Sequence, residues 1–429
     1  MTKYIIQPIQ SGKLSGCLTV PPSKSQSMRA VLLASLGRGH SQIRNLLKAP
    51  DVELMIEICR DMGAEIRVSN DLTEVWGFGA KPERNQPVIN AGNSGIILRF
   101  VSAIAGLGNK TYTLTGDDSI CSMRPMQTLL DALSDLGANA SSIHENGFAP
   151  LEIKGPLQAG TVKLSGQDSQ PISALLIATS FLEGKSEIHV DNPGETPWID
   201  LTLDWLRFLG VTIHNHNYTQ YVVEGYATYA GFTYRVPGDW SSAAFPLTAA
   251  VLSGSELTLH NLDMNDPQGD KQIVDLLIDM GVNLEIDEKE KSIKVLEGKH
   301  ALKGREVDVN AFIDALPILS VLGTVAEGGM HLKNAAVART KESDRITVMT
   351  SELKKMGADI EERDDGMIIR PSKLHGAELD SHQDHRIAMS LTIAGLCAEG
   401  TTIVNDVEMV SKTYPKFREE MQSIGADIQ

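Results

Sequence analysis

One pattern of apolar and polar positions recurs six times along the chain: an amphipathic helix, a glycine, and then an apolar segment of strand type. In one copy the helix carries Ile346, Met349, Leu353 and Met356 at intervals of three and four, which predicts one buried face. A glycine directly after such a helix is typical of the left-handed C-terminal cap. The six glycines lie 68 to 76 residues apart, at Gly63, Gly137, Gly210, Gly281, Gly357 and Gly425.

The segments between these glycines also follow one order: a hairpin, a second apolar helix, a strand, and the helix that ends at the next glycine. Hairpin turns are indicated at residues 70–71, 145–147 and 364–366. The pattern predicts an α/β fold of six βαβαββ units. The sixth copy ends after one strand, and Tyr4-Ile5-Ile6 is a strand without a unit, so we expect the N-terminal strand to complete the last repeat.

Three units per domain would give two domains, with chain crossings near Pro21-Pro22 and Pro237-Gly238. We expect residues 21–238 to form the first domain and residues 1–20 plus 239–429 to form the second. Two connecting strands would allow such domains to close over a cleft that holds the active site. A chain of 429 residues is too long for a single ordinary core.

Composition narrows the class of protein. The formal net charge of −16 argues against a general nucleic-acid binder, and the mean hydropathy of −0.11 is that of a soluble globular chain. The N-terminus lacks an apolar signal core, and no apolar run is long enough to span a membrane. The four cysteines are far apart and form no zinc or disulfide pattern. We therefore expect a cytoplasmic protein.

The segment from Arg339 to Arg345 is a run of charge before a predicted helix, with five charged residues of seven. Alone, such a run is most often a solvated first turn of a helix. If Thr340 or Ser343 caps the helix, its N-terminal N–H groups would point where Lys341 and Arg345 reach from one face. Glu342, three residues before Arg345, could be held by that arginine. The segment then outlines an anion site with an acid beside it.

Basic residues recur at other helix starts, where they oppose the helix dipole unless an anion is bound. Neither a P-loop nor a dinucleotide-binding glycine motif is present. His382 and His385 have too few neighbouring ligand types to favour a metal over a proton-handling histidine. The segments of interest contain Lys24, Ser25 and Arg29; Gly92, Gly95 and Arg99; Arg124; Ser169 and Gln170; Asp314; Asp384, His385 and Arg386; and Lys412.

Taken in order, these segments resemble the 5-enolpyruvylshikimate-3-phosphate synthase family over essentially the whole chain. The specific motifs are Lys341-Glu-Ser-Asp-Arg345 and Asp384-His-Arg386. The resemblance implies a two-domain inside-out α/β barrel, with three repeats per domain and shikimate 3-phosphate bound on the side of the first domain. It implies transfer of the enolpyruvyl group of phosphoenolpyruvate to the 5-hydroxyl of shikimate 3-phosphate, a step of aromatic amino acid biosynthesis. No metal or other cofactor and no nucleic acid or membrane is implied, and we expect a monomer.

The resemblance also assigns residues by position. Those for phosphoenolpyruvate are Lys24, Gly95, Arg124, Gln170, Arg345, Arg386 and Lys412. Those for shikimate 3-phosphate are Lys24, Ser25, Arg29, Ser169, Gln170, Asp314 and Lys341. Asp314 is the candidate acceptor of the hydroxyl proton. Glu342 and Lys24 are candidates for exchanging a proton with C3 of the enolpyruvyl group, assisted by His385.

Several positions depart from the family pattern. Asp168, Glu195, Trp198 and Val337 stand where Ser, Ser, Tyr and Asn are usual near shikimate 3-phosphate. Two extra acids there would weaken phosphate binding unless they point away.

Ile96 and Phe100 replace the usual Thr and Pro beside the glycine-rich turn. We expect a bulkier residue there to move Gly95 and to reduce inhibition by glyphosate, which occupies the phosphoenolpyruvate pocket in the family.

Three alternatives remain. The sister enzyme, UDP-N-acetylglucosamine enolpyruvyl transferase, carries a reactive cysteine five residues before an Arg-Pro pair, whereas Cys121 precedes Arg124 by three. A non-catalytic anion-binding relative would gain nothing from the acids Asp314 and Glu342. An RNA-processing enzyme built from similar repeats would conflict with the acidic charge balance.

Overall fold

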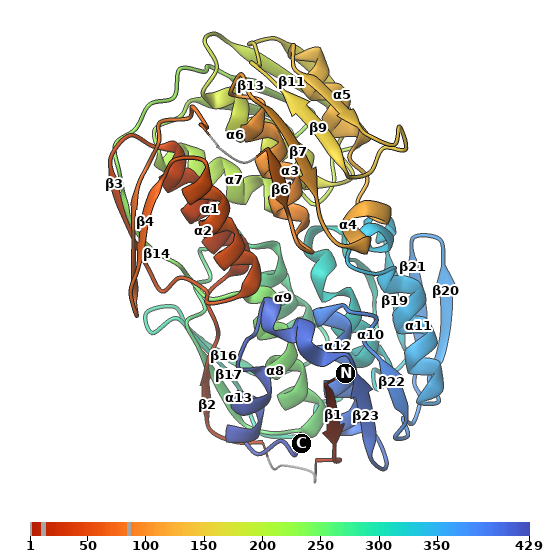
Figure 1. Ribbon diagram of the computed structural model, residues 1–429. Coiled ribbons are helices and arrows are strands. Elements are labelled where there is room, and N and C mark those ends of the chain that lie inside the picture. The colour runs from red at the N-terminus through yellow and green to blue at the C-terminus, as the bar shows by residue number, and fades with distance from the viewer. Residues whose placement is uncertain (1, 10–13, 84–86) are drawn as a thin grey trace. The chain divides into compact units, whose positions relative to one another are not determined.

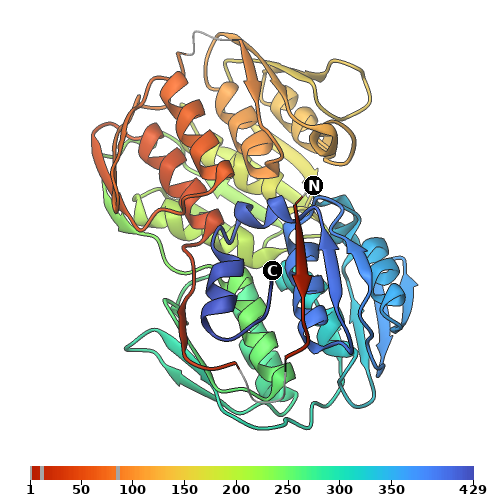
Figure 2. The same cartoon turned by 60° about the horizontal axis from the view of Figure 1, so that its bottom comes forward.

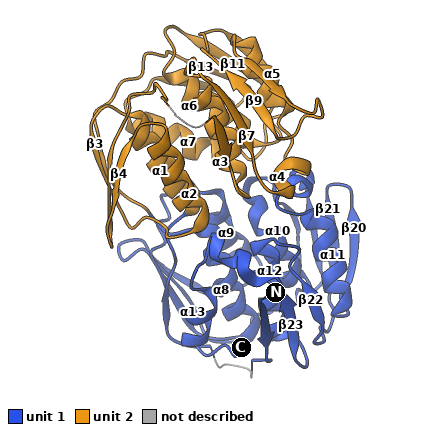
Figure 3. Ribbon diagram, in the orientation of Figure 1, with its two compact units in different colours: residues 1–23, 237–429 blue, residues 24–236 orange. Residues whose placement is uncertain are grey.

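The structure is a computed structural model that describes residues 2–9, 14–83 and 87–429 (Figure 1). It is a mixed α/β protein that divides into two compact units (Figure 3). Unit 1 comprises residues 1–23 and 237–429, and unit 2 comprises residues 24–236. The chain thus passes between the units twice, after Ser23 and after Val236.

Unit 2 contains three four-stranded sheets, with strand orders β14-β3-β5-β4, β6-β7-β9-β8 and β10-β11-β13-β12. In each sheet the first pair of strands is parallel and the other two pairs are antiparallel. Its elements in chain order are α1 (Lys24–Leu36), β3 (His40–Arg44), α2 (Pro50–Asp61), β4 (Glu65–Val68), β5 (Leu72–Trp76), β6 (Val88–Asn90), α3 (Gly95–Ala105), β7 (Thr111–Thr115), α4 (Asp118–Ser122), α5 (Gln127–Asp135), β8 (Asn139–Ser142), β9 (Leu151–Lys154), β10 (Thr161–Ser165), α6 (Ser169–Ser180), β11 (Ser186–Asp191), α7 (Thr196–Phe208), β12 (Ile213–His216), β13 (Gln220–Val223) and β14 (Thr233–Arg235).

Unit 1 contains two four-stranded sheets, β16-β17-β15-β2 and β18-β19-β21-β20, and the three-stranded sheet β1-β23-β22. Its elements are β1 (Lys3–Ile6), β2 (Cys17–Thr19), α8 (Trp240–Ser253), β15 (Leu257–His260), the 3₁₀ helix η1 (Gly269–Lys271), α9 (Gln272–Asp279), β16 (Leu284–Asp287), β17 (Ser292–Val295), β18 (Glu306–Asp308), η2 (Asn310–Ala315), α10 (Leu316–Gly323), β19 (Met330–Lys333), η3 (Ala336–Thr340), α11 (Arg345–Lys355), β20 (Asp359–Arg363), β21 (Gly366–Arg370), β22 (Glu378–Asp380), α12 (His385–Cys397), β23 (Thr402–Asn405), η4 (Val407–Lys412) and α13 (Phe417–Ser423).

Both ends of the chain belong to the sheet that contains β23. Strand β1 pairs antiparallel with β23, from Lys3 opposite Asn405 to Ile6 opposite Thr402, and the two strands lie side by side in Figures 1 and 2. Ile6 also forms a bridge with Ile428, close to the C-terminus. The first strand of the chain is therefore joined to its last segment by backbone hydrogen bonds.

The six repeated glycines end helices as the sequence predicts. Gly63, for example, follows the last residues of α2 with a φ of 117°, and strand β4 starts two residues later. All six have positive φ, a conformation that side chains with a Cβ rarely adopt. The prediction of a left-handed glycine after each helix is confirmed.

Several helices are apolar on all sides and lie in the interior. Every residue of α3 is buried, and the first twelve residues of α8 and of α12 are buried as well. In unit 1, α8, α10 and α12 pack against one another, and in unit 2, α3 packs against α6. Strands such as β10 alternate between exposed and buried residues, so their sheets present one face to solvent. The helices thus lie inside and the sheets outside. Because the central helices are buried, their first turns are held in place and can position functional side chains.

Candidate functional site

The charged segment before α11 is built differently from the sequence prediction. Neither Thr340 nor Ser343 caps the helix: Asp344 does, with Oδ1 accepting from the Thr347 N–H at 3.1 Å. The Thr340 hydroxyl donates instead to the Val337 carbonyl at 3.1 Å, and the Ser343 hydroxyl donates to Asp384 Oδ2 at 3.1 Å. A carboxylate is a good helix cap, and the two hydroxyls are already used elsewhere.

The prediction that Lys341 and Arg345 share one helix face is wrong. Lys341 lies before the helix, with an extended backbone at φ −87° and ψ −149°. The residue is nevertheless only 9% exposed, and its positive charge acts on the carboxyl of Asp314. The segment is therefore not a solvated first turn, and it brings two cations to one cluster by a bend in the chain.

Arg345 is the centre of that cluster. It is 1% exposed, and its three nitrogens contact three carboxylates: Nη1 lies 2.7 Å from Asp314 Oδ1, Nη2 lies 2.9 Å from Glu342 Oε2, and Nε lies 2.8 Å from Asp384 Oδ2. Burial lowers the pKa of Arg345, but the three carboxylates outweigh burial and hold the pKa above its usual range. The predicted contact between Arg345 and Glu342 is confirmed.

Asp314 and Glu342 each join Arg345 to a second cation. Asp314 Oδ2 lies 2.7 Å from Nη2 of Arg386, and Glu342 Oε1 accepts from Nζ of Lys412 at 3.0 Å. Burial raises the pKa of Asp314. The positive charges of Arg386, Arg345 and Lys341 lower the pKa by more than burial raises it, so the pKa lies well below its usual range. Four predicted ligands of an anion, at residues 341, 345, 386 and 412, thus share one network with two predicted acids.

His385 lies at the start of α12, and Asp384 is the cap of that helix. The carboxylate of Asp384 accepts from the Arg386 N–H at 2.9 Å, and Nδ1 of His385 lies 3.7 Å from its Oδ1. His385 is 1% exposed. Asp384 therefore contacts three of the predicted site residues, Arg345, His385 and Arg386, although the sequence pattern predicts no role for it beyond a motif position. Its place directly before a basic helix start was the available signal.

In unit 2, Lys24 begins α1, and its Nζ lies 3.6 Å from Asp51 Oδ2 of α2. Arg29, one turn later, is 3% exposed and reaches across its unit. Its Nε donates to Thr202 Oγ1 at 3.0 Å, Nη1 donates to the Ser25 carbonyl at 3.2 Å, and Nη2 donates to the Trp198 carbonyl at 3.4 Å. Burial lowers the pKa of Arg29 to about 9. Arg29 is thus bonded to Ser25 and to Trp198, and Trp198 is one of the residues that differ from the family pattern.

A second cluster forms at the start of α3. A Cβ added to Gly95 would lie 2.9 Å from Arg99 Nη1, 3.2 Å from Gln170 Oε1 and 3.9 Å from Arg124 Nη1. Arg99 Nη1 donates to Gln170 Oε1 at 3.1 Å. Gly95, Gln170 and Arg124, which the sequence assigns to one ligand, are therefore neighbours. Arg99 is a member that the sequence prediction left without a role, although it follows Gly95 by one helical turn.

The two extra acids of unit 2 both contact the start of α6, Asp168 as the residue before this helix and Glu195 from the residue before α7. Asp168 caps α6 through the Gln170 N–H at 2.9 Å, and its Oδ2 lies 2.8 Å from Arg99 Nη2. Glu195 is 1% exposed, and its Oε2 accepts from both the N–H and the hydroxyl of Ser169, at 3.0 and 3.1 Å. Neither acid points away from the predicted ligands, so both compete with any anion that binds there.

The remaining departures have packing partners. The ring of Phe100 is fully buried, with the Arg29 guanidinium carbon 5.0 Å from the ring centroid. Ile96 is 9% exposed in the first turn of α3, directly after Gly95. Val337 lies in η3 and packs against the hydrophobic core of unit 1.

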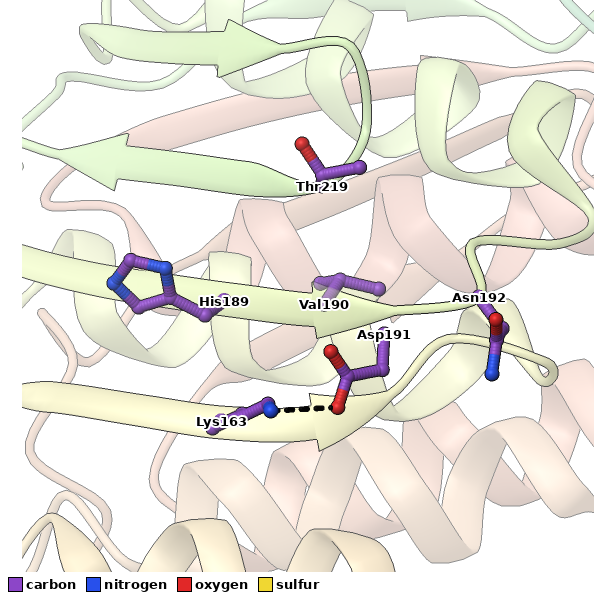
Figure 4. A pocket seen from close by; sticks show the side chains of 6 residues that line it. All are labelled: Lys163, His189, Val190, Asp191, Asn192 and Thr219. Carbon is purple, nitrogen blue, oxygen red and sulfur yellow. Dashed lines mark ion pairs between the residues drawn. The ribbon is translucent and has the colours of Figure 1, made fainter.

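Two hollows among the described residues are lined by side chains other than the predicted ones. The first, of about 720 Å³, lies over strands β10 and β11 (Figure 4). It is lined by Lys163, His189, Val190, Asp191, Asn192 and Thr219. Lys163 and Asp191 form an ion pair of 2.9 Å there, and both are more than half exposed. The second, of about 350 Å³, is lined in unit 1 by mainly apolar residues, which include Ile9, Leu302 and Cys397.

Within the described residues, no group of His, Cys, Asp and Glu side chains is suited to a metal ion, and no helix is long and apolar enough to cross a membrane.

The order of basic and acidic residues over both units matches one known family. The model of the EPSP synthase family, 3-phosphoshikimate 1-carboxyvinyltransferase, matches residues 8–421. The chain belongs to the EPSP synthase family. The resemblance predicted from Lys341-Glu-Ser-Asp-Arg345 and Asp384-His-Arg386 is thereby confirmed, and the family is one of transferases.

Relatives named 3-phosphoshikimate 1-carboxyvinyltransferase match the chain from end to end. One from Acetivibrio thermocellus is 43% identical over 420 residues, with 98% of each chain covered. One from Ruminiclostridium cellulolyticum is 41% identical over 98% of this chain and 99% of its own length. Among solved structures, an EPSP synthase from Acinetobacter baumannii superposes with a TM-score of 0.81 at 29% identity, covering 100% of this chain and 99% of that one. The EPSP synthase family therefore accounts for both units.

Proposed function

We propose that this chain transfers the enolpyruvyl group of phosphoenolpyruvate to the 5-hydroxyl of shikimate 3-phosphate and releases phosphate. The observation that supports this most directly is the network around Arg345, in which Asp314 and Glu342 each bridge two cations. Such a network offers positive charge to an anionic substrate and keeps two acids beside it.

Phosphoenolpyruvate would bind to Lys24, Gly95, Arg124, Gln170, Arg345, Arg386 and Lys412. In unit 1, its carboxylate and phosphate would compete with Asp314 and Glu342 for the cations that these acids now hold. Shikimate 3-phosphate would bind to Lys24, Ser25, Arg29, Ser169, Gln170, Asp314 and Lys341. Fixed guanidinium groups suit planar anions because they donate two parallel hydrogen bonds.

Asp314 would accept the proton of the 5-hydroxyl while the hydroxyl oxygen bonds to C2 of phosphoenolpyruvate and a proton is added to C3. Loss of that C3 proton, with cleavage of the bond between C2 and the phosphate oxygen, gives the product. In the free protein, Arg386 and Arg345 keep the pKa of Asp314 low, so this carboxylate is a weak base. When the substrate takes those arginines, the pKa rises and Asp314 becomes a stronger base. Glu342 and Lys24 would exchange the C3 proton, with His385 as an electrostatic partner.

The fold supports the proposal in finer detail. The order of elements agrees with three βαβαββ units in each domain, with helices inside and sheets outside, as in an inside-out barrel. We propose that residues 21–238 and residues 1–20 with 239–429 act as these domains. We also propose that the protein works as a cytoplasmic monomer.

The test is phosphate release from phosphoenolpyruvate, measured with shikimate 3-phosphate in one sample and UDP-N-acetylglucosamine in another. We expect release only with shikimate 3-phosphate. Release only with UDP-N-acetylglucosamine would show that the sister reaction is the correct one. Binding of shikimate 3-phosphate with no release in either sample would support a non-catalytic anion-binding protein.

Cys121 provides a second test against the sister enzyme. Its thiol, in α4, lies 3.7 Å from the Gly116 carbonyl oxygen and 3.9 Å from Thr115 Oγ1. Because no step of the proposed reaction uses this thiol, alkylation should leave at least about half of the activity. A Cys121→Ala variant that is treated in parallel shows how much loss comes from other thiols. Abolition of activity that this substitution prevents would contradict the proposal.

Replacing Glu195 by glutamine is expected to improve binding of shikimate 3-phosphate. The carboxylate now holds both donors of Ser169, and its charge repels a phosphate. Removal of one close negative charge should lower the KM for shikimate 3-phosphate by about threefold to tenfold and leave kcat nearly unchanged. Steady-state kinetics at saturating phosphoenolpyruvate measures both constants. Glu183→Gln, at an exposed position, is the matched control. A higher KM in Glu195→Gln would show that the carboxylate assists binding.

We further propose that Ile96 reduces sensitivity to glyphosate. Ile96 follows Gly95, where an added Cβ would lie 2.9 Å from Arg99 Nη1 and 3.2 Å from Gln170 Oε1. Ile96→Thr should lower the glyphosate concentration for half-inhibition by about threefold or more at fixed phosphoenolpyruvate. Adding Phe100→Pro would complete the family pattern, but it removes the ring that packs against Arg29, so the single variant is the cleaner comparison. Equal inhibition of the parent and both variants would refute the proposal.

A further inference from the structure

Asp270 is a buried acid that the proposed mechanism does not use. It lies in η1, between β15 and α9, and is fully buried. Among the described residues, neither of its carboxylate oxygens has a hydrogen-bond partner. An ionised carboxylate in that position would lack both water and donors, which costs several kcal/mol. The geometry therefore favours a neutral carboxyl group.

The short helix that holds Asp270 is fixed by its neighbour Gln268. The Gln268 side chain accepts from the Trp240 N–H at 3.2 Å and donates to the Gly238 carbonyl at 2.9 Å. On the other side, Nζ of Lys271 donates to the carbonyls of Met264 and Asp266, at 2.9 and 2.8 Å. These bonds anchor η1 to the start of α8 and to its own loop. The backbone that carries Asp270 is therefore held in place on both sides.

The charged groups that act on Asp270 belong to the network of the proposed site. Asp314 comes from η2, Arg386 from α12, Asp239 from the cap of α8, and Arg345 from α11. Burial, with the negative charges of Asp314 and Asp239, raises the pKa of Asp270 well above its usual range against the opposing effect of the two arginines. Helix α9 also packs on η1, and its acids Asp275 and Asp279 are exposed.

Arg386 is one of the two cations whose charge acts on Asp270. Its Nη2 lies 2.7 Å from Asp314, whereas Nε and Nη1 are buried without a hydrogen-bond partner among the described residues. A second ionised carboxylate beside this guanidinium would neutralise it further. A neutral carboxyl leaves the cation available to an anion.

We propose that Asp270 is a positioning residue that stays protonated and thereby keeps Arg386 available for an anionic substrate. The inference rests on the proposed role of Arg386 in binding phosphoenolpyruvate. It adds a function to an acid that touches no substrate. Ionisation of Asp270 at alkaline pH should then weaken phosphoenolpyruvate binding through Arg386 and Asp314.

The test compares the parent with Asp270→Asn, which is uncharged at every pH and similar in shape. Phosphoenolpyruvate binding is measured by calorimetry with shikimate 3-phosphate present, from pH 6.5 to 9.5. We expect the two Kd values to agree within threefold near pH 7, and the parent to bind at least threefold more weakly than the variant at pH 9.5. A difference of more than threefold near pH 7 overturns the proposal in either direction: weaker binding by the variant would show that the carboxyl group itself assists binding, and weaker binding by the parent would show that Asp270 is already ionised. Asp287→Asn, at an exposed hairpin position, should follow the parent throughout.

Denaturant unfolding supplies a readout that does not depend on the substrate. Because the folded pKa of Asp270 is raised, its carboxyl favours the folded state fully only below the unfolded pKa of about 3.9, and this stability is lost as pH rises toward the folded pKa. Relative to the parent, Asp270→Asn should therefore gain stability between pH 4 and pH 8. No gain would show that Asp270 is ionised and overturn the proposal, even if the protein binds no phosphoenolpyruvate. If Asp270→Asn gains stability but the protein does not bind phosphoenolpyruvate, the proposed function and the effect of Asp270 on Arg386 are both refuted. Only the conclusion that Asp270 is protonated would then stand.

Discussion

Asp314→Asn is expected to lower kcat by about 10² to 10⁴ without raising the KM for phosphoenolpyruvate. Asparagine keeps the size of the side chain but cannot accept the proton of the 5-hydroxyl. It also removes the charge that now competes for Arg345 and Arg386, at 2.7 Å each. Binding of phosphoenolpyruvate should therefore be unchanged or tighter while the chemical step is slow. Steady-state and single-turnover kinetics separate the two effects.

The control for this variant is Asp308→Asn, which alters an exposed acid of the same unit that contacts only Asn334 and the Asn310 N–H among the hydrogen bonds described. It should retain kcat within about twofold.

Because the pKa of Asp314 is lowered in the folded protein, its contribution to stability is present above the unfolded pKa of about 3.9 and is lost as pH falls through the folded value. Asp314→Asn should thus be less stable than the parent near pH 7 and approach it in acid. A kcat within tenfold of the parent would remove Asp314 from the proton transfer.

The helix ends and the coarse fold class could be predicted because they depend on local rules. A glycine after an amphipathic helix has a direct backbone reason, the positive φ that is found at Gly63 and at its five counterparts. The α/β class follows from alternating helix and strand patterns, and the family follows from motifs that are contiguous in the chain. Each of these signals lies within a few residues of what it predicts.

The errors arose where a residue had several possible partners. Thr340, Ser343 and Asp344 are all acceptable helix caps in sequence. The choice depends on Asp384, which lies 41 residues after Ser343 and accepts from its hydroxyl. The spacing of four residues predicts that Lys341 lies on the helix, but the helix starts later because Asp344 is the cap. Tertiary partners decided both cases.

Asp270 was missed for a similar reason. In the sequence, Asp270 is one acid in a polar loop, and the composition of that loop is typical of an exposed turn. Only the structure shows that Gln268 fixes this loop against α8 and that Asp270 is fully buried near Arg386. Roles that depend on burial and on the sum of several charges cannot be derived from residue spacing.

Arg345→Met is expected to lower the free energy of unfolding by about 3 to 5 kcal/mol, in addition to abolishing detectable phosphoenolpyruvate binding. The substitution leaves the carboxylates of Asp314, Glu342 and Asp384 around an apolar side chain. Arg386 and Lys412 still pair with two of them, but Asp384 is fully buried and loses its closest cation. Arg345→Lys keeps the charge but not the three-way geometry, so its loss of stability should be smaller.

Arg370→Met is the matched control because Arg370 also pairs with two acids, at 3.0 and 3.2 Å, but is about half exposed. Its cost should stay below about 1 kcal/mol, since water screens exposed pairs. The pH dependence separates charge from packing. Protonation of the stranded carboxylates should restore part of the stability of Arg345→Met as pH falls toward 4, whereas a packing defect would persist. Equal losses in Arg345→Met and Arg370→Met would mean that the buried network contributes no more than a surface pair, and the site would then have to hold its acids by other contacts.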